Sequence, residues 1–189
     1  MKALVLNGSP KPNGTVGGLL KLLADNLSPA YRVEWINVYD LKVRPCFGCM
    51  KCRPDGECVL PPDDGQTLGQ KIREAQLLLI GSPVYWANMS SPLKAVFDRN
   101  VPAFIGETPG GMPKAKNRGK KAALVTACAT PAVWDFLAGE SRGALRALKE
   151  ILRYSGFKIV GCLVKSGTRS DPVISDKLKK QARKLANRL

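Results

Sequence analysis

KALVLNGSPKPNGTVGGLLKLLADNL, residues 2–27, is the stretch that decides the fold. Its first six residues form a nearly continuous apolar run, and a turn rich in glycine, proline and asparagine follows. From residue 16 to residue 27, apolar side chains return at the spacing of one helix face: Val16, Leu19, Leu20, Leu23 and Leu27. The stretch therefore predicts a buried strand, a tight turn and a covering helix.

The same unit recurs along the chain. Further strands are expected at about 31–38, 77–82, 121–127 and 158–164, and further helices at about 64–76, 90–99, 140–155 and 172–188. Apolar runs that alternate with amphipathic stretches are typical of a parallel sheet with helices on both faces. We predict an α/β fold with a flavodoxin-like, doubly wound, five-stranded parallel sheet of order 2-1-3-4-5. Other three-layer α/β folds remain open at this point.

Length and composition fit one compact domain. The chain has 189 residues, of which 44% are hydrophobic and 24% charged, enough to bury a sizeable core. We expect a single domain over 1–189 that carries a cysteine-rich loop at about 43–63. A segment at about 100–120 is rich in proline, glycine and lysine, and we expect an irregular insertion there.

The start of the chain predicts a cytoplasmic protein with no membrane span. MKALVLNGSP has one lysine and an apolar run that is too short for a signal peptide or a transmembrane helix. Cysteines in that compartment stay reduced and serve metals or redox chemistry.

The charge is strongly positive. Thirty basic and 15 acidic residues give a net charge of +15, which favours anionic partners. Much of it lies in 114–121 and in the last predicted helix, where a solvated basic face is the simplest explanation. No recognisable nucleic-acid-binding module is present, so nucleic acid is an unfavoured partner. Histidine is absent, which excludes histidine-based catalysis and metal sites.

Four cysteines lie within CFGCMKCRPDGEC, residues 46–58. Cys46, Cys49 and Cys52 form two CxxC steps that share their middle member, and a turn at Pro54 and Gly56 brings back Cys58. This spacing suits a [4Fe-4S] cluster, which takes four thiolates. A zinc site, disulfides and thiols that bind nothing remain alternatives.

Three loops follow predicted strands at the edge where doubly wound sheets bind ligands. After the first strand, Ser9, Lys11, Asn13 and Thr15 lie in a glycine-containing turn before a helix, which suits a phosphate. After the third strand, residues 83–86 place two aromatic rings where a flat ligand could stack. Small residues from Thr126 to Thr130 end the fourth strand. The cysteine loop follows the second strand, so we expect it on the same edge.

With these motifs the chain resembles the iron-sulfur flavoproteins and, more broadly, the flavodoxin-like NAD(P)H-dependent FMN reductases. The resemblance rests on GSPKPNGT, the cysteine loop with DD after it, GSPVYWANMSSPLKAVFDR and KAALVT. It implies a [4Fe-4S] cluster on Cys46, Cys49, Cys52 and Cys58 beside a bound FMN. It also implies homo-oligomers, either dimers or tetramers.

Carried over by position, the resemblance also implies the FMN contacts. They fall in three groups: Ser9, Lys11, Asn13 and Thr15 for the phosphate, Pro83, Val84, Tyr85, Trp86 and Asn88 for the ribityl chain and ring, and Thr126 at the start of the third segment. The chain departs from the family pattern at two of these positions: Lys11-Pro12 stands where an arginine without a following proline is common, and no glycine follows Thr126.

The leading functional hypothesis is an FMN-dependent oxidoreductase that transfers electrons between the cluster and FMN. An acidic electron carrier such as ferredoxin is the expected partner, and no side chain is assigned a catalytic role because the cofactors carry the chemistry. One alternative is a cluster-free NAD(P)H-dependent FMN or quinone reductase. Another is a non-enzymatic zinc- or nucleic-acid-binding module.

Overall fold

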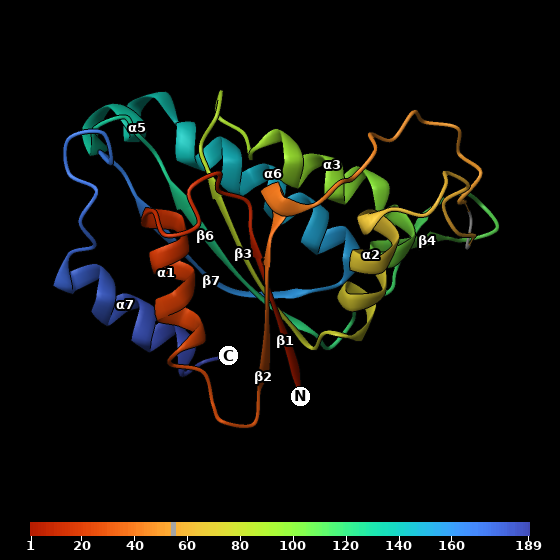
Figure 1. The fold of residues 1–189 in the computed structure, drawn as a ribbon, viewed down its shortest axis with the longest axis horizontal. Coiled ribbons are helices and arrows are strands. Elements are labelled where there is room, and N and C mark those ends of the chain that lie inside the picture. Colours follow the sequence, from red (N-terminus) through yellow and green to blue (C-terminus); the bar gives the residue numbers. More distant parts are fainter. Residues whose placement is uncertain (54–55) are drawn as a thin grey trace.

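A computed structural model describes residues 1–53 and 56–189, and a five-stranded parallel sheet forms its centre (Figure 1). The strands run in the order β2-β1-β3-β6-β7. Their bounds are β1 (Lys2–Asn7), β2 (Arg32–Asn37), β3 (Leu77–Pro83), β6 (Lys121–Ala127) and β7 (Lys158–Lys165). Counting only these strands, the order is 2-1-3-4-5, which confirms the predicted doubly wound fold.

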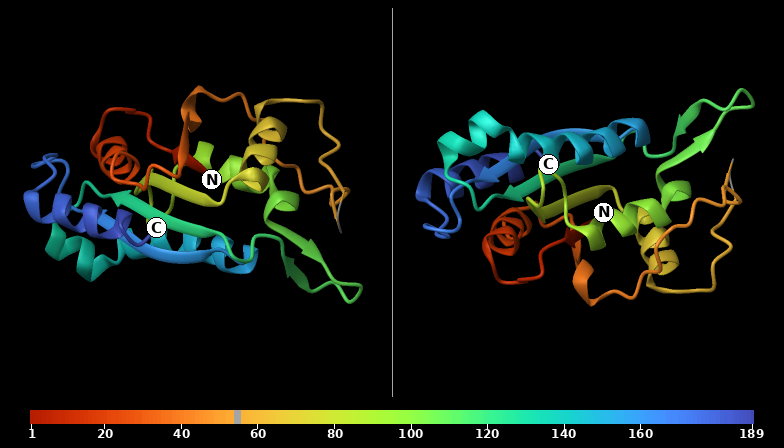
Figure 2. Two further views of the ribbon diagram at one scale, coloured as in Figure 1. Left: turned by 90° about the horizontal axis from the view of Figure 1, so that it is seen from below. Right: turned by 90° about the horizontal axis from the view of Figure 1, so that it is seen from above.

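Helices cover both faces of the sheet (Figure 2). One face packs against α1 (Thr15–Ala24) and α7 (Asp176–Ala186), and the other against α2 (Asp64–Glu74), α3 (Ser91–Arg99) and α6 (Glu140–Ser155). Successive residues of β1 point to opposite faces, so Ala3 and Val5 contact the α1 side while Leu4 and Leu6 contact the α6 side. This explains why the central strands are apolar throughout.

The segment at 100–120 has more regular structure than expected. It contains α4 (Val101–Phe104) and an antiparallel pair, β4 (Ile105–Glu107) with β5 (Pro113–Ala115). The connecting turn is closed by Thr108, whose backbone N–H donates to the Met112 carbonyl oxygen at 2.8 Å and whose hydroxyl accepts from the Met112 N–H at 3.1 Å. Strands this short carry no detectable periodicity.

Two helices also differ from expectation. The prediction missed α5 (Ala132–Ala138), and α7 begins at Asp176 instead of near residue 172. The start of α7 is fixed by Ser175, whose hydroxyl accepts from the Leu178 N–H at 3.4 Å, as an N-cap residue does. A short 3-10 turn, η1 (Val38–Asp40), follows β2 and leads into the cysteine loop. Among the residues described, no helix is both long and apolar enough to cross a bilayer.

Candidate functional site

The predicted ligand-binding edge of the sheet is held together at the start of α3. Ser90 precedes that helix; its hydroxyl donates to the Gly8 carbonyl oxygen at 2.7 Å, and its N–H donates to the Ser82 hydroxyl at 2.9 Å. The Gly8 N–H in turn donates to the Gly81 carbonyl oxygen at 2.8 Å. The loops after β1 and β3 are thus joined side by side.

The loop after β1 is shaped by buried polar groups. Asn7 is fully buried, and its side-chain oxygen accepts from the Ser9 N–H at 3.2 Å. The Ser9 hydroxyl is used within the loop, because it donates to the Lys11 carbonyl oxygen at 3.2 Å. A Cβ on Gly17 would lie 1.7 Å from the Pro12 carbonyl oxygen, so only glycine fits where the helix passes beneath this loop. Sequence reasoning missed Asn7 because a strand-end asparagine carries no motif.

The first turn of α1 is open to an anion. Its N-cap, Gly14, makes no side-chain capping bond and the turn has no acidic residue, whereas α2 and α7 both have side-chain caps. Backbone N–H groups at such a helix start attract phosphate. Lys11 and Asn13 are exposed beside this turn, whereas the Thr15 hydroxyl donates to the Pro172 carbonyl oxygen at 3.1 Å.

The loop after β3 makes a tight turn that projects a tryptophan into solvent. Tyr85 and Asn88 exchange two backbone hydrogen bonds of 2.9 Å. Between them, Trp86 and Ala87 have φ angles of 51° and 54°, a region that costs energy for residues other than glycine. Gly143 of α6 supports the turn from below, since a Cβ there would lie 2.4 Å from the Ala87 carbonyl oxygen. Trp86 is 101% exposed and free to contact a ligand or a neighbouring chain.

The segment after β6 is more buried than the other two. The Thr126 hydroxyl donates to the Ser82 carbonyl oxygen at 3.0 Å, so this side chain links β6 to β3. The Cys128 thiol donates to Glu140 at 3.1 Å, and Glu140 also accepts from the Thr130 hydroxyl at 2.8 Å. Burial raises the pKa of Cys128, and the bond to Glu140 raises it further. Cys128 is therefore a protonated donor with no assigned chemical role.

The four clustered cysteines line one cavity of about 290 Å³. All of them are free thiols, and Asp98, Arg99 and Val101 close the cavity at the C-terminal end of α3. The loop starts at the predicted edge after η1, where Cys46 lines a hollow together with Ser91 and Pro92 at the start of α3. From there it runs beside α3, so that the cavity of all four cysteines lies at the other end of this nine-residue helix (Figure 1).

The cysteine loop has a left-handed backbone at two residues that line the cavity. Gly48 and Met50 have φ angles of 71° and 60°, and the Gly48 N–H donates to the Cys46 sulfur at 3.4 Å. Burial raises the pKa of Cys52, and the nearby Cys58, Cys46 and Cys49 raise it further. Four thiols that line one cavity form a donor set that suits a single metal centre. The turn predicted at Pro54 lies outside the described residues.

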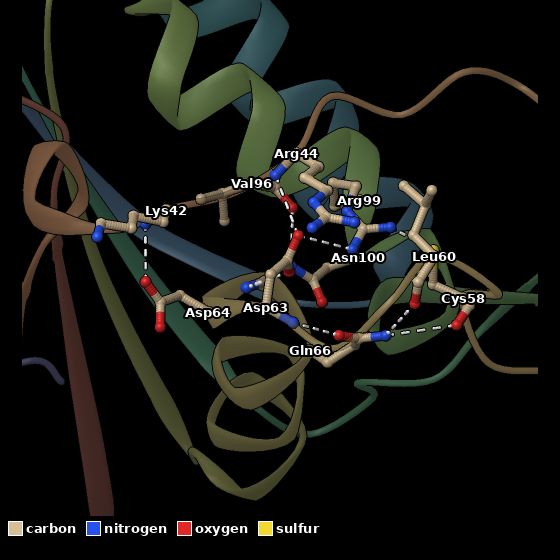
Figure 3. Close-up of polar contacts among 11 residues, drawn as sticks. Lys42, Arg44, Cys58, Leu60, Asp63, Asp64, Gln66, Val96, Arg99 and Asn100 are labelled. Carbon is tan, nitrogen blue, oxygen red and sulfur yellow. Dashed lines mark hydrogen bonds and ion pairs between the residues drawn. The ribbon is translucent and has the colours of Figure 1, made fainter.

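Two charged residues anchor the end of the cysteine loop to the fold (Figure 3). Arg99 is 4% exposed; one terminal nitrogen donates to the Cys58 sulfur and the other donates to the Asp63 carboxylate at 3.0 Å. Asp63 also accepts from the Arg44 N–H at 3.0 Å and the Gly65 N–H at 2.8 Å, the latter as N-cap of α2.

Sequence reasoning missed Arg99 and Asp63 as parts of the site. Burial alone raises the pKa of Asp63, but hydrogen bonds from Arg44, Arg99 and Gly65 outweigh it and hold the pKa below its usual value. The available signals were the DD pair after the loop and the DR pair that ends GSPVYWANMSSPLKAVFDR. The sequence alone does not show that Asp63 of the first pair contacts Arg99 of the second.

Comparison with known proteins identifies the family and the fold of the chain. The family model for NADPH-dependent FMN reductases matches residues 1–162. "Iron-sulfur flavoprotein MJ1083" of Methanocaldococcus jannaschii is 34% identical over 107 residues, which cover 56% of this chain and 55% of the relative. The NADH-dependent FMN reductase SfnF of Pseudomonas putida is 29% identical over 120 residues, 58% of this chain and 61% of the relative. The chain spans about half the length of the first curated relatives it matches.

Solved structures share the fold over nearly the whole chain. The NAD(P)H:quinone oxidoreductase from Methanothermobacter marburgensis superposes with a TM-score of 0.73 at 18% identity, covering 100% of this chain and 94% of its own. Smu.1420 from Streptococcus mutans gives 0.75 at 21% identity, covering 99% and 97%. At these identities the likeness concerns the fold.

Proposed function

The chain belongs to the NADPH-dependent FMN reductase family, and we propose that it is a flavin-dependent oxidoreductase in which electrons pass between a [4Fe-4S] cluster and FMN. The observation that carries the proposal is the single cavity lined by Cys46, Cys49, Cys52 and Cys58. The family supplies the flavin half of the proposal. The cysteines, at the spacing of one metal centre, supply the other half.

FMN is proposed to bind at the edge of the sheet beside the start of α3. The open first turn of α1 would hold the phosphate, with Lys11 and Asn13 beside it and Ser9 and Thr15 shaping the loop and its connection to α7. The remaining proposed contacts come from the other two loops: Pro83, Val84, Tyr85, Trp86, Asn88 and Thr126. Because the Thr126 side chain is fully buried, its contribution would come from the backbone.

The cluster is proposed to bind to the four cysteine thiolates at the other end of α3. When bound, the cluster supplies one-electron transfer and FMN takes up two electrons and two protons. The chain's own task is to hold the two groups about one short helix apart and to limit water around them. This work needs no protein acid or base, which agrees with a chain that has no histidine.

Partners and compartment follow as further parts of the proposal. The net charge of +15 favours an acidic electron carrier such as ferredoxin. Cytoplasmic thiols stay reduced and able to bind iron. A homo-oligomer is supported by exposed apolar side chains on α5: Val133, Trp134, Phe136 and Leu137.

The proposal is tested by measuring the iron, acid-labile sulfide, zinc and FMN content of the purified protein. Protein purified without oxygen should contain about four irons, about four acid-labile sulfides and one FMN per chain, and no stoichiometric zinc. Flavin without iron would overturn the cluster half of the proposal. Zinc without flavin would favour the non-enzymatic alternative.

A second candidate is a cluster-free NAD(P)H-dependent FMN or quinone reductase. The family model and the similarity to a P. putida NADH-dependent FMN reductase favour it. The variant Cys52→Ser separates the two functions, with Cys162→Ser as the matched control because Cys162 lies in β7, outside the cysteine cavity. Undiminished NAD(P)H turnover by iron-free C52S would favour this candidate, whereas electron transfer lost in C52S and kept in C162S supports the first.

A further inference from the structure

We propose that Arg99 is a positioning residue that donates a charged hydrogen bond to the Cys58 sulfur and raises the reduction potential of the metal centre held there. The inference rests on the cluster proposed above and deepens it. It concerns a residue that is not itself a ligand but lines the same cavity as all four cysteines.

The Arg99 guanidinium is withdrawn from water. Its side chain is 1% exposed and that of its partner Asp63 is 9% exposed, so the pair is not an ordinary surface ion pair. Figure 3 shows the guanidinium of Arg99 between the carboxylate of Asp63 and the segment that carries Cys58. One terminal nitrogen donates to Asp63 at 3.0 Å and the other donates to the Cys58 sulfur.

One donor of this guanidinium is unsatisfied. Arg99 Nε is buried and has no hydrogen-bond partner among the residues that the structure describes. A buried donor without an acceptor costs free energy, most of all on a charged group. This nitrogen lies beside Gly65 at the start of α2, on the Asp63 side of the guanidinium. A metal centre on four thiolates would bring negative charge to the other side, where the second terminal nitrogen donates to Cys58, and would stabilise the charge of the whole group. Arginine suits this position better than lysine, because its planar guanidinium can donate to Asp63 and Cys58 at the same time.

Asp63 fixes the direction of the guanidinium. Its carboxylate is held by the N–H groups of Arg44 and Gly65, because Asp63 is also the N-cap of α2. Gln66 completes this cap and donates to the carbonyl oxygens of Leu60 at 3.0 Å and Cys58 at 3.4 Å. The start of α2 therefore positions both the Arg99 guanidinium and the backbone of Cys58, whose sulfur Arg99 contacts.

The effect on the potential has a definite sign. Reduction adds one electron, and hence one negative charge, to the cluster and its thiolates. A buried positive charge beside Cys58 stabilises that reduced form more than the oxidised form, and hydrogen bonds to ligand sulfurs are known to tune such centres. The negative charge of Asp63 has the opposite effect. Removing the positive charge of Arg99 should therefore lower the reduction potential, and removing the negative charge of Asp63 should raise it.

The test compares Arg99→Met and Asp63→Asn in anaerobically purified holoprotein. Potentiometric titration, followed by the electron paramagnetic resonance signal of the reduced cluster, should give a more negative potential for R99M and a more positive one for D63N. Asparagine also caps helices, so in D63N its side-chain oxygen keeps the bond from the Gly65 N–H, while its amide nitrogen replaces the oxygen that accepts from Arg99 and Arg44. R99K keeps the positive charge but loses the planar pair of donors, so its reduction potential should lie between those of R99M and wild type.

Arg53→Met is the control. Arg53 also lines the cavity, but it pairs with Glu107 and its side chain is 30% exposed, so R53M should shift the reduction potential less than R99M does.

If R99M does not fold, the R99M/D63N double variant is compared with D63N, since it leaves no unpaired buried charge. A more negative potential in the double variant supports the inference. Shifts of the same sign in R99M and D63N, or no shift in iron-loaded protein, overturn it while leaving the proposed function intact. Loss of iron from both R99K and the double variant also overturns it, because Arg99 would then serve assembly of the site. Wild-type protein without iron overturns the proposed function, and the inference with it.

Discussion

Gly17 lies where α1 passes beneath the loop proposed to hold phosphate. A methyl group there would meet the Pro12 carbonyl oxygen at 1.7 Å, too close for the backbone to accept. We expect Gly17→Ala to lower the free energy of unfolding by about 1–3 kcal/mol. It should also weaken FMN binding by about tenfold or more, equivalent to at least about 1.4 kcal/mol, because the loop must move.

Gly18→Ala is the matched control for this prediction. Its added methyl group would meet only the end of the Ile174 side chain, at 3.0 Å, which can shift. Urea denaturation and fluorescence titration with FMN measure the two effects. Equal behaviour of the two variants would show that the tight approach at Gly17 does not shape the binding loop.

At the residue scale, the sequence predicts which residues lie in a binding loop better than it predicts which groups their side chains contact. The loop after β1 could be assigned because glycine, proline and asparagine cluster in a turn before an amphipathic helix. That the Thr15 hydroxyl turns toward Pro172, or that the Thr126 hydroxyl bonds Ser82, depends on segments far apart in the chain. The meeting of Arg99 with Cys58 spans 41 residues and has no local signal.

At the scale of elements, the strands could be predicted because both faces of the sheet are covered and the central strands are apolar throughout. The helix α5 could not, because its large apolar side chains are exposed and show no amphipathic period. The path of the cysteine loop was also beyond prediction. Its distant anchors, the Arg44 amide on Asp63 and Arg99 on Cys58, bring it to the far end of α3.

Asp135 joins α5 to the start of α6 and to the loop after β7. Its carboxylate accepts from the Ser141 N–H at 2.8 Å and hydroxyl at 2.7 Å, and also from the Ser166 hydroxyl. Burial alone raises its pKa, but these hydrogen bonds outweigh burial and hold the pKa below its usual value. We expect Asp135→Asn to lower the free energy of unfolding by about 1.5–3 kcal/mol at pH 7.

The pH dependence of this effect has a defined sign. A carboxyl with a lowered folded-state pKa stabilises the fold fully above its unfolded pKa, about 3.9, and loses this contribution as pH falls through the folded value. The difference between wild type and D135N should therefore shrink below about pH 4. Urea denaturation at several pH values measures it, with the exposed Asp176→Asn as control. A difference that stays constant down to pH 3 would contradict the assignment.

At the scale of the whole molecule, α5 presents apolar side chains that the described chain leaves uncovered. Burying them in a homo-oligomer is the simplest use of this surface. We expect Trp134→Glu to lower the molar mass measured by light scattering to that of one chain, whereas Val173→Glu, which changes another exposed apolar residue, should not. An unchanged mass for W134E would exclude α5 from the interface.

The charge of the molecule makes a second prediction at this scale. With a net charge of +15, docking of an acidic ferredoxin should be steered electrostatically. Raising ionic strength from about 0.01 to 0.15 M shortens the screening length from about 30 to 8 Å, so the bimolecular rate of reduction should fall steeply. Stopped-flow mixing measures this rate. A rate of reduction that does not change with ionic strength would rule out electrostatic docking.

The central claim is that each chain holds both a flavin and an iron-sulfur cluster, at opposite ends of α3. Anaerobic reductive titration counts the electrons that each chain accepts, while flavin absorbance and electron paramagnetic resonance show where they go. We expect about three electrons per chain, two in FMN and one in the cluster. Saturation at about two electrons, with flavin bleaching and no cluster signal, would contradict the account.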